Sequence, residues 1–348
     1  MNVWRSAEFD GHEQICVFTD EKVGLKAIVA IHSTALGPAA GGTRFKPYAR
    51  DDDALDDALR LSRAMSYKSA LAGLPVGGGK AVIIGDPRAL KSTDLLHAYG
   101  RFIDRIGRTF ATGEDVGITV ADMDRIAEVT PFVGGTSRGI DPSIPTAEGV
   151  VQGLRAVLKR LFGTDCFDGV RLAVQGLGAV GWGVAERLHA QGARLVVADI
   201  REERVQQAVT AFNARSAACD TIHAVDCDIF VPCALGGVIS KASVIELKSK
   251  AVAGSANNQL ASPEAGAMLA RRGILFAPDY VINAGGIISG IIGAASLPGR
   301  EMRGLPPLDA AIEAIYDRLM VIFDHAEASQ VTPEIAAERM ARKMIGRG

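Results

Sequence analysis

The chain has 348 residues, which at about 150 residues per domain suggests two domains. Its 48% hydrophobic and 22% charged residues are typical of packed globular proteins and exclude a disordered, collagen-like or disulfide-scaffold protein. The 38 basic residues nearly balance the 40 acidic ones, so we expect neither nucleic acid nor a membrane as partner. Because the first residues lack a signal-peptide pattern and no apolar run is long enough to span a bilayer, we expect a cytoplasmic protein.

The first part of the chain mixes strand and helix patterns. Residues 24–31 alternate so that every second side chain is apolar and lies on one face, which predicts a strand. Residues 52–65 carry an apolar stripe behind an acidic first turn, which predicts an amphipathic helix. Residues 134–145 are rich in Gly, Pro and Ser, so we expect them to link two domains.

Beyond this linker the sequence predicts alternating helices and strands. A helix is expected from Thr146, as its N-cap, to about residue 162. Short continuous apolar runs then alternate with helical stretches, which is typical of parallel strands covered on both faces. Residues 308–328 predict a long helix, and a last helix is expected to begin at Pro333. The pattern therefore predicts an α/β protein.

The cysteines give no sign of a metal site or a disulfide framework. They are five in number, and none forms a C-x-x-C pair or lies at ligand spacing from a histidine. We expect buried free thiols and no bound metal. The cysteines are Cys16, Cys166, Cys219, Cys227 and Cys233.

A glycine-rich motif predicts a dinucleotide site in the second domain. The motif consists of Gly176, Leu177, Gly178, Ala179, Val180 and Gly181. It follows an apolar run and opens a helix, the context that the G-x-G-x-x-G fingerprint of a Rossmann-type, doubly wound sheet requires. The first glycine permits a tight turn, the second lets backbone N–H groups approach a pyrophosphate, and the third lets helix and strand pack closely. The alternative is a tight turn that binds nothing.

An acidic residue after this motif indicates which dinucleotide binds. Asp199 lies 21 residues after Gly178, at the end of the next apolar run. A carboxylate there can accept hydrogen bonds from a ribose and repel a 2′-phosphate, which favours NAD over NADP. Arg201 is close by and keeps NADP open as an alternative.

Two lysines and an acidic pair in the first half are candidates for catalysis. Lys68 and Lys80 lie twelve residues apart, and three glycines before Lys80 would expose it and let a substrate approach the backbone. Two ammonium groups in a dehydrated cleft disfavour each other's charge, so one lysine could act as an acid or base. Glu114 and Asp115 lie in an apolar, glycine-flanked segment and could share a proton with the lysines. The alternative is that both lysines are solvated surface residues.

Eight sequence blocks resemble the bacterial leucine, phenylalanine and valine dehydrogenases of the glutamate dehydrogenase superfamily, and phenylalanine dehydrogenase most. They come in the family's order and span about residues 12–345. The blocks are GPAAGGTRF (37–45), MSYK (65–68), GGGKAVIIGDP (77–87), GEDVG (113–117), QGLGAVG (175–181), DIFVPCALGG (228–237), AGSANNQL (253–260) and APDYVINAGG (277–286).

The resemblance implies a function and a domain plan. The function is the reversible, NAD-dependent oxidative deamination of an L-amino acid to its 2-oxo acid and ammonia, by a homo-oligomer. Two domains would lie around a cleft. Residues 1–135, with a C-terminal helix of about 328–348, would form the domain for substrate binding and oligomerisation. Residues 146–327 would form the NAD-binding Rossmann domain. The bare backbone at the many glycines is expected to let ligands come close.

Individual roles also follow from the resemblance. Lys80 would be the general acid and base, and Asp115 would exchange a proton with the amino group. Lys68 would bind the substrate carboxylate with help from the backbone at Gly41 and Gly42. Asn258 would lie near the substrate amine and the nicotinamide, unless it is a turn residue. Further cofactor contacts are implied at Thr146, Ala234, Leu235, Ala256, Asn257 and Asn283.

Four positions are implied to line the side-chain pocket: Ala40, Gly113, Ile287 and Gly290. Leucine-type members tend to carry Leu, Ala, Val and Val there, so this pocket would be larger overall. We therefore expect phenylalanine as substrate, with tryptophan or tyrosine next and leucine or valine as the branched-chain alternative. Residues 287–299 depart from the family pattern, which puts Gly290 and the pocket rim in doubt. A catalytically inactive NAD-binding protein is a remote alternative, since it would not need Lys68, Lys80 and Asp115 together.

Overall fold

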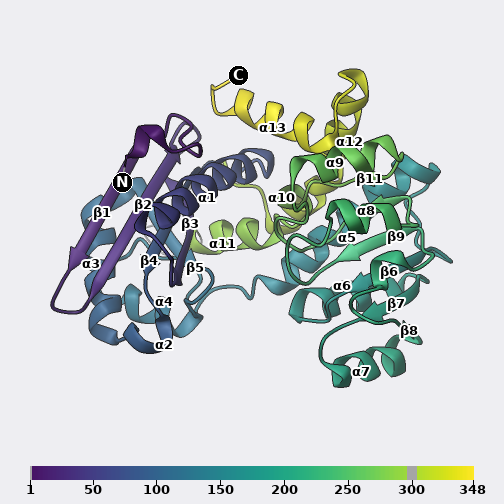
Figure 1. The fold of residues 1–348 in the computed structure, drawn as a ribbon, viewed down its shortest axis with the longest axis horizontal. Helices are drawn as coiled ribbons and strands as arrows, with labels where there is room; N and C mark the ends of the chain where they lie inside the picture. The colour runs from purple at the N-terminus through teal and green to yellow at the C-terminus, as the bar shows by residue number, and fades with distance from the viewer. Residues whose placement is uncertain (1, 296–303) are drawn as a thin grey trace. The chain divides into compact units, whose positions relative to one another are not determined.

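The computed structural model describes residues 2–295 and 304–348, so the last part of the unusual segment 287–299 lies outside the described residues. The chain divides into two compact units, and their helices and strands are labelled along the ribbon in Figure 1. The first contains Met1–Ile140, Gly290–Leu305 and Ala341–Gly348, and the second contains Asp141–Ser289 and Pro306–Met340. No helix among the described residues is long and apolar enough to cross a membrane.

The first unit is built on a five-stranded mixed sheet in the order β1-β2-β4-β3-β5. β2 pairs antiparallel with β1 and β4, whereas β3 pairs parallel with β4 and β5. Its strands are β1 (Gln14–Asp20), β2 (Leu25–Ser33), β3 (Ala39–Lys46), β4 (Gly77–Ile84) and β5 (Phe110–Glu114). Its helices are η1 (Val3–Arg5), α1 (Asp51–Leu71), α2 (Pro87–Leu90), α3 (Thr93–Ile106), η2 (Gly107–Thr109) and α4 (Val120–Ala127).

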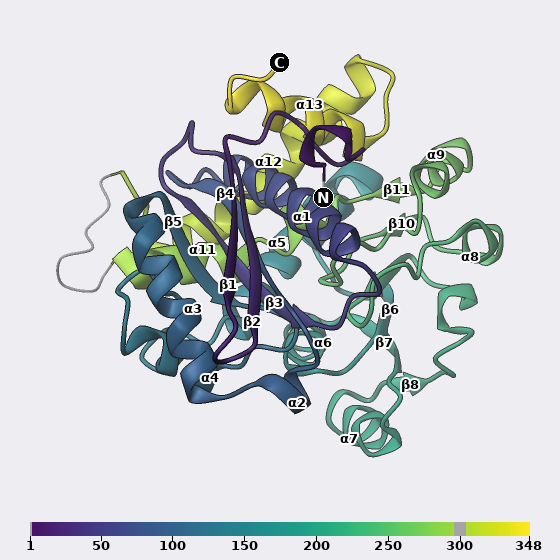
Figure 2. The ribbon, with the colours of Figure 1, turned by 60° about the vertical axis from the view of Figure 1, so that its left-hand side comes forward.

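The predicted strand at 24–31 is confirmed as β2, but both of its faces are buried. Val29 and its alternate neighbours pack with α3 and α4, whereas Ile28 and Ala30 pack with α1. Figure 2 shows α1 and α3 on opposite faces of the sheet. The predicted helix at 52–65 is confirmed as part of α1, which continues to Leu71. α1 therefore covers one face of the sheet, which we call the α1 face, and α3 covers the opposite face.

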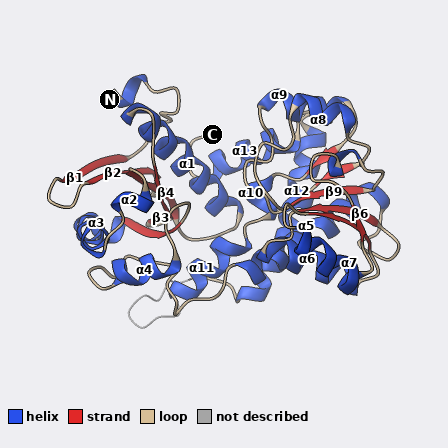
Figure 3. Cartoon of the chain, turned by 60° about the horizontal axis from the view of Figure 1, so that its bottom comes forward, coloured by secondary structure: helices blue, strands red, loops and turns tan. Residues whose placement is uncertain are grey.

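The second unit is built on a six-stranded sheet in the order β11-β10-β9-β6-β7-β8, with every pair parallel. Figure 3 shows its strands between two pairs of helices, with α8 (Lys241–Glu246) and α9 (Pro263–Arg271) on one side and α5 (Ser143–Phe162) and α6 (Ala179–Ala190) on the other. This confirms the predicted α/β class and the doubly wound sheet of the second domain. Its strands are β6 (Arg171–Gln175), β7 (Arg194–Ala198), β8 (Arg215–Ser216), β9 (Ile229–Pro232), β10 (Ala251–Val252) and β11 (Leu275–Phe276).

The helices of the second unit are α5 (Ser143–Phe162), α6 (Ala179–Ala190), α7 (Glu202–Phe212), η3 (Ile222–Ala224), α8 (Lys241–Glu246), α9 (Pro263–Arg271), α10 (Asp279–Ile282) and α12 (Leu308–Ala328). Two further helices, α11 (Gly285–Ala295) and α13 (Pro333–Met344), begin in the second unit and end in the first. The helices expected at 308–328 and from Pro333 are confirmed.

Two local expectations are wrong. Thr146 is not an N-cap, because α5 begins at Ser143, whose N–H donates to the carboxylate of Asp141 at 2.9 Å. Thr146 lies inside the first turns and its hydroxyl donates to the carbonyl of Pro142 at 2.6 Å. The five cysteines are free as expected, but only Cys227 is buried and Cys166 is exposed.

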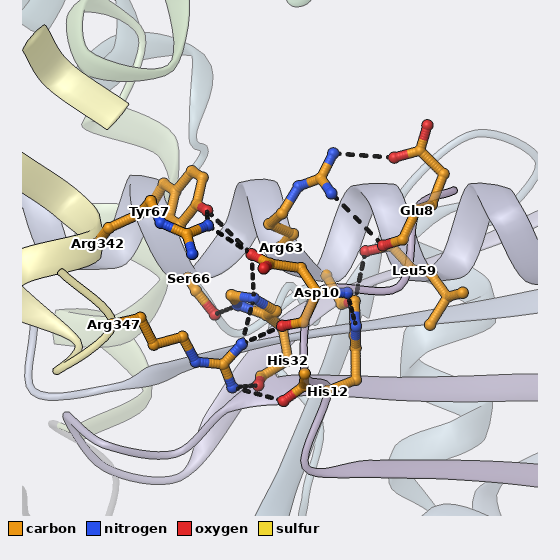
Figure 4. A network of polar contacts seen from close by, with 12 residues as sticks. Glu8, Asp10, His12, His32, Leu59, Arg63, Ser66, Tyr67, Arg342 and Arg347 are labelled. Atoms are coloured by element: carbon orange, nitrogen blue, oxygen red, sulfur yellow. Dashed lines mark hydrogen bonds and ion pairs between the residues drawn. The ribbon is translucent and has the colours of Figure 1, made fainter. Parts of the chain in front are cut away.

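The C-terminal residues of the first unit are fixed by a polar network around His32 (Figure 4). Arg342 of α13 donates to the Asp10 carboxylate at 2.8 Å and to the Tyr67 hydroxyl at 3.0 Å. Arg347 donates to the carbonyl of His32 at 2.6 Å and to its Nε2 at 2.8 Å. The end of the chain is thus bound to β2 and α1 through charge-assisted hydrogen bonds.

Candidate active site

Lys80 and Asp115 form a buried ion pair in the first unit. Lys80 lies in the middle of β4, and Asp115 directly follows β5. The ammonium of Lys80 contacts Oδ2 of Asp115, while Oδ1 accepts the backbone N–H of Val116 at 2.6 Å. Only 7% of Lys80 is exposed. The structure therefore brings the two predicted catalytic residues into direct contact.

The environment lowers the pKa of both groups. This disfavours the charged form of Lys80 and favours the charged form of Asp115. Burial lowers the pKa of Lys80, and the nearby carboxylate of Asp115 only partly offsets this effect. Burial alone would raise the pKa of Asp115, but the Lys80 ammonium beside it outweighs burial and holds that pKa below its usual value. The pair thus combines a lysine that loses its proton more readily than usual with a carboxylate that stays ionised.

The expectation that three glycines expose Lys80 is wrong. Gly77, Gly78 and Gly79 are buried in β4. A Cβ would lie 2.0 Å from the Ser33 carbonyl oxygen at Gly77, and 2.0 Å from the Ser66 backbone nitrogen at Gly78. These glycines therefore let β4 pack against its protein neighbours.

The residues expected to bind the substrate carboxylate come from α1 and β3. Lys68 is half-buried in the last turn of α1. Gly41 and Gly42 lie in β3, where a Cβ would be 1.8 Å from the carbonyl oxygen of Gly79 and 2.5 Å from that of Glu114, respectively. The absence of side chains at both positions is therefore required by the neighbouring strands themselves.

The four expected pocket positions fall in both units. Ala40 is buried in β3, and Gly113 lies in the adjacent β5, where the carbonyl oxygen of Gly134, at 4.0 Å, is the nearest atom of the described residues to a Cβ placed there. Gly290 is exposed on α11 in the first unit, and no atom of residues 2–295 or 304–348 lies within 4 Å of such a Cβ. Ile287 is half-buried on the same helix but belongs to the second unit. Gly113 and Gly290 thus have room for a larger group.

The glycine-rich motif forms the turn between β6 and α6 in the second unit. Gly176 has φ +95°, a left-handed conformation that only glycine adopts easily, and its N–H donates to the Ala198 carbonyl at 2.7 Å. A Cβ at Gly181 would lie 2.0 Å from the carbonyl oxygen of Gly176, so this glycine permits close packing of helix and turn. Gly178 precedes the first turn of α6 and faces open space. The helix N-terminus is therefore accessible beside Gly178.

The side chain of Asp199 stabilises this turn by hydrogen bonding to its backbone. It follows β7, and its carboxylate accepts the Leu177 N–H at 2.6 Å and the Arg201 N–H at 2.9 Å. Burial opposes its ionisation, but these backbone N–H groups, Leu177 first, hold the pKa of Asp199 below its usual value. The side chain of Leu177 is buried and its N–H already has a partner. A carboxylate has about four acceptor positions, so Asp199 retains capacity for a ribose hydroxyl.

Other expected cofactor residues follow neighbouring parallel strands of the same sheet. Ala234 and Leu235 follow β9, and the Leu235 side chain is 84% exposed. Ala256, Asn257 and Asn258 follow β10, and Asn258 adopts a left-handed φ of +51°. The carboxyl ends of parallel strands meet at one edge of a sheet, where doubly wound folds bind nucleotides.

The two remaining expected cofactor residues are Asn283 and Thr146. The Asn283 amide donates to the side-chain oxygen of Asn257 at 2.7 Å and to the Ser255 carbonyl at 3.1 Å. Thr146 lies on α5. Its hydroxyl oxygen would be 3.0 Å from a Cβ placed on Gly286. The structure therefore places Asn283 against Asn257, and Thr146 against the start of α11.

Comparison with known proteins establishes the family. A model described as "Glu/Leu/Phe/Val dehydrogenase, dimerisation domain" matches residues 12–131, and one described as "Glutamate/Leucine/Phenylalanine/Valine dehydrogenase" matches residues 197–296. The leucine dehydrogenase of Geobacillus stearothermophilus is 45% identical over 99% of this chain and 94% of its own length. The chain belongs to the Glu/Leu/Phe/Val dehydrogenase family.

Other relatives of this dehydrogenase carry different substrate names. The valine dehydrogenase of Streptomyces virginiae is 46% identical over 96% of this chain and 94% of its own. The crystal structure of L-tryptophan dehydrogenase from Nostoc punctiforme superposes with a TM-score of 0.86, at 41% identity, covering 97% of this chain and 96% of that one. The protein is an amino-acid dehydrogenase, an oxidoreductase acting on CH–NH2 groups.

Sequence reasoning about this dehydrogenase missed Arg44 and Asp57. The Nη1 of Arg44, on β3, donates to the Asp57 carboxylate at 3.0 Å, and its Nη2 lies 3.6 Å from Oδ2 of Asp115. Arg44 belongs to the block GPAAGGTRF and lies two residues after Gly42, which is expected to help bind the substrate, so this position was one available signal. The signal for Asp57 was that an acidic residue lies on the buried face of α1.

Proposed function

We propose that the dehydrogenase catalyses the NAD-dependent, reversible oxidative deamination of an L-amino acid with an apolar side chain to its 2-oxo acid and ammonia. The observation that carries this proposal is the buried contact between Lys80 and Asp115. The reaction requires proton transfers at two adjacent atoms of the substrate. A lysine with a lowered pKa beside an ionised carboxylate supplies the two groups needed.

Lys80, Asp115 and Lys68 have separate roles in this proposed reaction. Neutral Lys80 accepts the proton of the water molecule that attacks the α-carbon, and Asp115 exchanges a proton with the amino group. Lys68 binds the substrate carboxylate as a point charge. Burial of the pair strengthens these electrostatic interactions, because water screens them less.

The residues of the glycine-rich turn fit NAD. The open space at Gly178 admits a pyrophosphate beside the N-terminus of α6. Asp199 is held in place at the adjacent strand end, ready to accept a hydrogen bond from a ribose hydroxyl and to repel a 2′-phosphate. NAD, when bound, supplies the acceptor for the hydride that leaves the α-carbon.

Branched-chain amino acids are the first candidate substrates. Leucine and valine dehydrogenase are the names of two relatives at 45% and 46% identity. These names favour leucine or valine over the phenylalanine expected from the sequence.

Aromatic amino acids are the second candidates. The open space around Gly113 and Gly290 supports this possibility, because a larger side chain could occupy it. The similarity to a tryptophan dehydrogenase structure at 41% identity supports it as well.

The experiment is to follow NADH formation by absorbance with a panel of L-amino acids at alkaline pH. We expect activity with leucine or valine, and with NAD rather than NADP. Aromatic substrates outpacing both branched-chain amino acids would favour the second candidate. The absence of activity with every amino acid in the panel would contradict the proposed function.

We also propose that the protein acts as a homo-oligomer, because the model matching residues 12–131 describes a dimerisation domain. Light scattering of the purified protein tests this. A mass of one chain, 36.5 kDa, at micromolar concentration would contradict it.

A further inference from the structure

Behind the Lys80–Asp115 pair, Arg44 lies between two carboxylates. Its Nη1 donates to both oxygens of Asp57, at 3.0 and 3.3 Å, and its Nη2 lies 3.6 Å from the Asp115 oxygen that Lys80 contacts. The guanidinium is planar and rigid. When Nη1 binds Asp57, the position of Nη2 is therefore largely fixed. Arg44 therefore connects α1 to the predicted catalytic carboxylate.

Strand register explains how Arg44 reaches this site. Arg44 on β3 pairs with Val82 on β4, two residues after Lys80. Side chains alternate along a strand, so Arg44, Val82 and Lys80 all lie on the α1 face of the sheet. Val82 packs with α1, which confirms the direction of that face.

Asp57 is itself firmly held. It is buried on α1 and accepts hydrogen bonds from the Tyr48 hydroxyl at 2.8 Å and from Arg60 at 2.6 Å. Lys46 lies 3.7 Å away. Burial opposes its ionisation, but the Tyr48 hydrogen bond and the guanidinium of Arg44 outweigh burial and keep the pKa of Asp57 low. Asp57 is therefore a fixed, ionised anchor for Arg44.

The arrangement does not maximise the hydrogen bonds of Arg44. Its Nε is buried and has no hydrogen-bond partner within the described parts of the chain. A buried donor without a partner destabilises the folded state. The guanidinium is thus placed where it reaches both carboxylates, at the expense of one hydrogen bond.

We propose that Arg44, anchored by Asp57, is a positioning residue that fixes the Asp115 carboxylate against Lys80 and keeps a positive charge beside the pair. This inference rests on the proposed dehydrogenase function. It assigns Arg44 no contact with substrate or cofactor. The charged groups that act on Lys80 include Asp115 after β5, Arg44 on β3 and Asp57 on α1.

The charge of Arg44 has a defined effect on proton transfer. It lowers the pKa of Lys80 by repulsion, in addition to burial, and it helps to keep the pKa of Asp115 low. Without it, Lys80 would hold its proton to higher pH. Because deamination needs neutral Lys80, the acid limb of the pH profile would then move to higher pH.

The test compares Arg44→Gln, Arg44→Lys and the wild-type enzyme in pH profiles of kcat/KM for deamination. We expect Arg44→Gln to move the acid limb up by about one pH unit and to lower kcat by about tenfold to a hundredfold, as misplaced catalytic groups do. Arg44→Lys retains the charge but not the planar fork, so its limb should return toward the wild-type position while kcat stays reduced.

A matched control removes another ion-paired arginine of the first unit. Arg63 on α1 pairs with Glu8 at 2.9 Å and does not contact the Arg44 network, so Arg63→Gln should leave the limb in place. A merely structural role for Arg44 would lower the melting temperature and leave the limb unmoved. An unmoved limb in folded Arg44→Gln therefore overturns the inference.

The remaining outcomes are also decisive. If Arg44→Gln does not fold, Arg44→Lys decides, and wild-type kcat in that variant overturns the positioning role. If the wild-type enzyme oxidises no amino acid, the proposed function fails. If the wild type is active and the variants match it, only the role of Arg44 fails.

Discussion

The guanidinium of Arg347 donates a hydrogen bond to Nε2 of His32 at 2.8 Å. Nε2 must therefore be unprotonated, and Nδ1 lies 2.8 Å from the Ser66 hydroxyl, to which it can donate. His32 is completely buried, and His12, Asp10 and Tyr67 surround it. Burial and, next, the charge of Arg347 lower the pKa of His32 to about 3, although Asp10 opposes this shift. The contact requires a neutral histidine.

Stability should consequently fall as pH falls below about 6.5. The unfolded chain takes up a proton on His32 near its ordinary value of 6.5, whereas the folded protein does not until about 3. The folded state is therefore penalised between these values, by about 1.4 kcal/mol per pH unit at most. From pH 6.5 to 5 the loss approaches ~2 kcal/mol, measurable by urea unfolding. Burial also lowers the pKa of His12, which adds in the same direction.

A paired comparison isolates His32. His32→Asn should be less stable than the wild type at pH 7, and its stability should depend less on pH between 6.5 and 5. His97→Asn is the control, because His97 pairs with Glu128 near the surface. Equal pH slopes for the wild type and His32→Asn would contradict this assignment.

Replacement of Lys80 should separate catalysis from cofactor binding. Lys80→Ala removes the proposed base and leaves Asp115 with Arg44 as its cationic neighbour. We expect turnover to fall by at least about 10²-fold, while NAD binding, measured by calorimetry, stays within about twofold. Lys91→Ala removes another, partly buried ion pair of the same unit, with Asp122, and should keep its turnover. If NAD binding is lost together with turnover, Lys80 has a structural role.

The glycines of the glycine-rich turn between β6 and α6 should respond differently to alanine. A Cβ at Gly181 would overlap the carbonyl oxygen of Gly176 at 2.0 Å, so Gly181→Ala should destabilise the protein by about 1–3 kcal/mol or more. Gly178 faces open space, so Gly178→Ala should fold normally and lose NAD affinity. Thermal unfolding and NAD titration of both variants check this. Unchanged NAD affinity in Gly178→Ala would argue against pyrophosphate binding at this turn.

Much of the second unit could be predicted because its signals are local. The spacing of Gly176, Gly181 and Asp199 reflects one β-turn-α connection and the following strand, which lie close together in sequence. Parallel strands buried on both faces are continuous apolar runs, which are readable without any partner. The N-cap prediction at Thr146 is wrong because α5 begins one turn earlier, at Ser143, whose N–H donates to Asp141.

The site of the first unit was only partly predictable, since it depends on pairing between distant segments. The role of Arg44 follows from the register of β3 with β4 and from an anchor on α1, neither of which has a sequence signature. The prediction that the glycines before Lys80 expose it is wrong for the same reason. Their neighbours, such as Ser33 and Ser66, approach only after the sheet and α1 have packed.

Asp199 should control the choice between NAD and NADP. Its carboxylate lies beside the glycine-rich turn, and the guanidinium Nε of Arg201 lies 3.3 Å from it. Asp199→Ser removes the negative charge and frees Arg201 to meet a 2′-phosphate. We expect the kcat/KM ratio of NADP to NAD to rise by about tenfold or more, which corresponds to ~1.4 kcal/mol. An unchanged ratio would mean that the ribose binds elsewhere.

The size of the side chain at position 113 should affect the preference between branched-chain and aromatic substrates. A methyl group added there would have the carbonyl oxygen of Gly134, at 4.0 Å, as its nearest neighbour among the described residues, so Gly113→Ala should fold and melt like the wild type. If Gly113 lines the substrate pocket, the methyl group fills space that a large ring needs. A methyl group in an apolar pocket is worth about 1–3 kcal/mol, so kcat/KM for phenylalanine or tryptophan should fall about tenfold or more relative to leucine. Steady-state kinetics with leucine, valine, phenylalanine and tryptophan measure this ratio. Equal effects on all four substrates would place Gly113 outside the side-chain pocket.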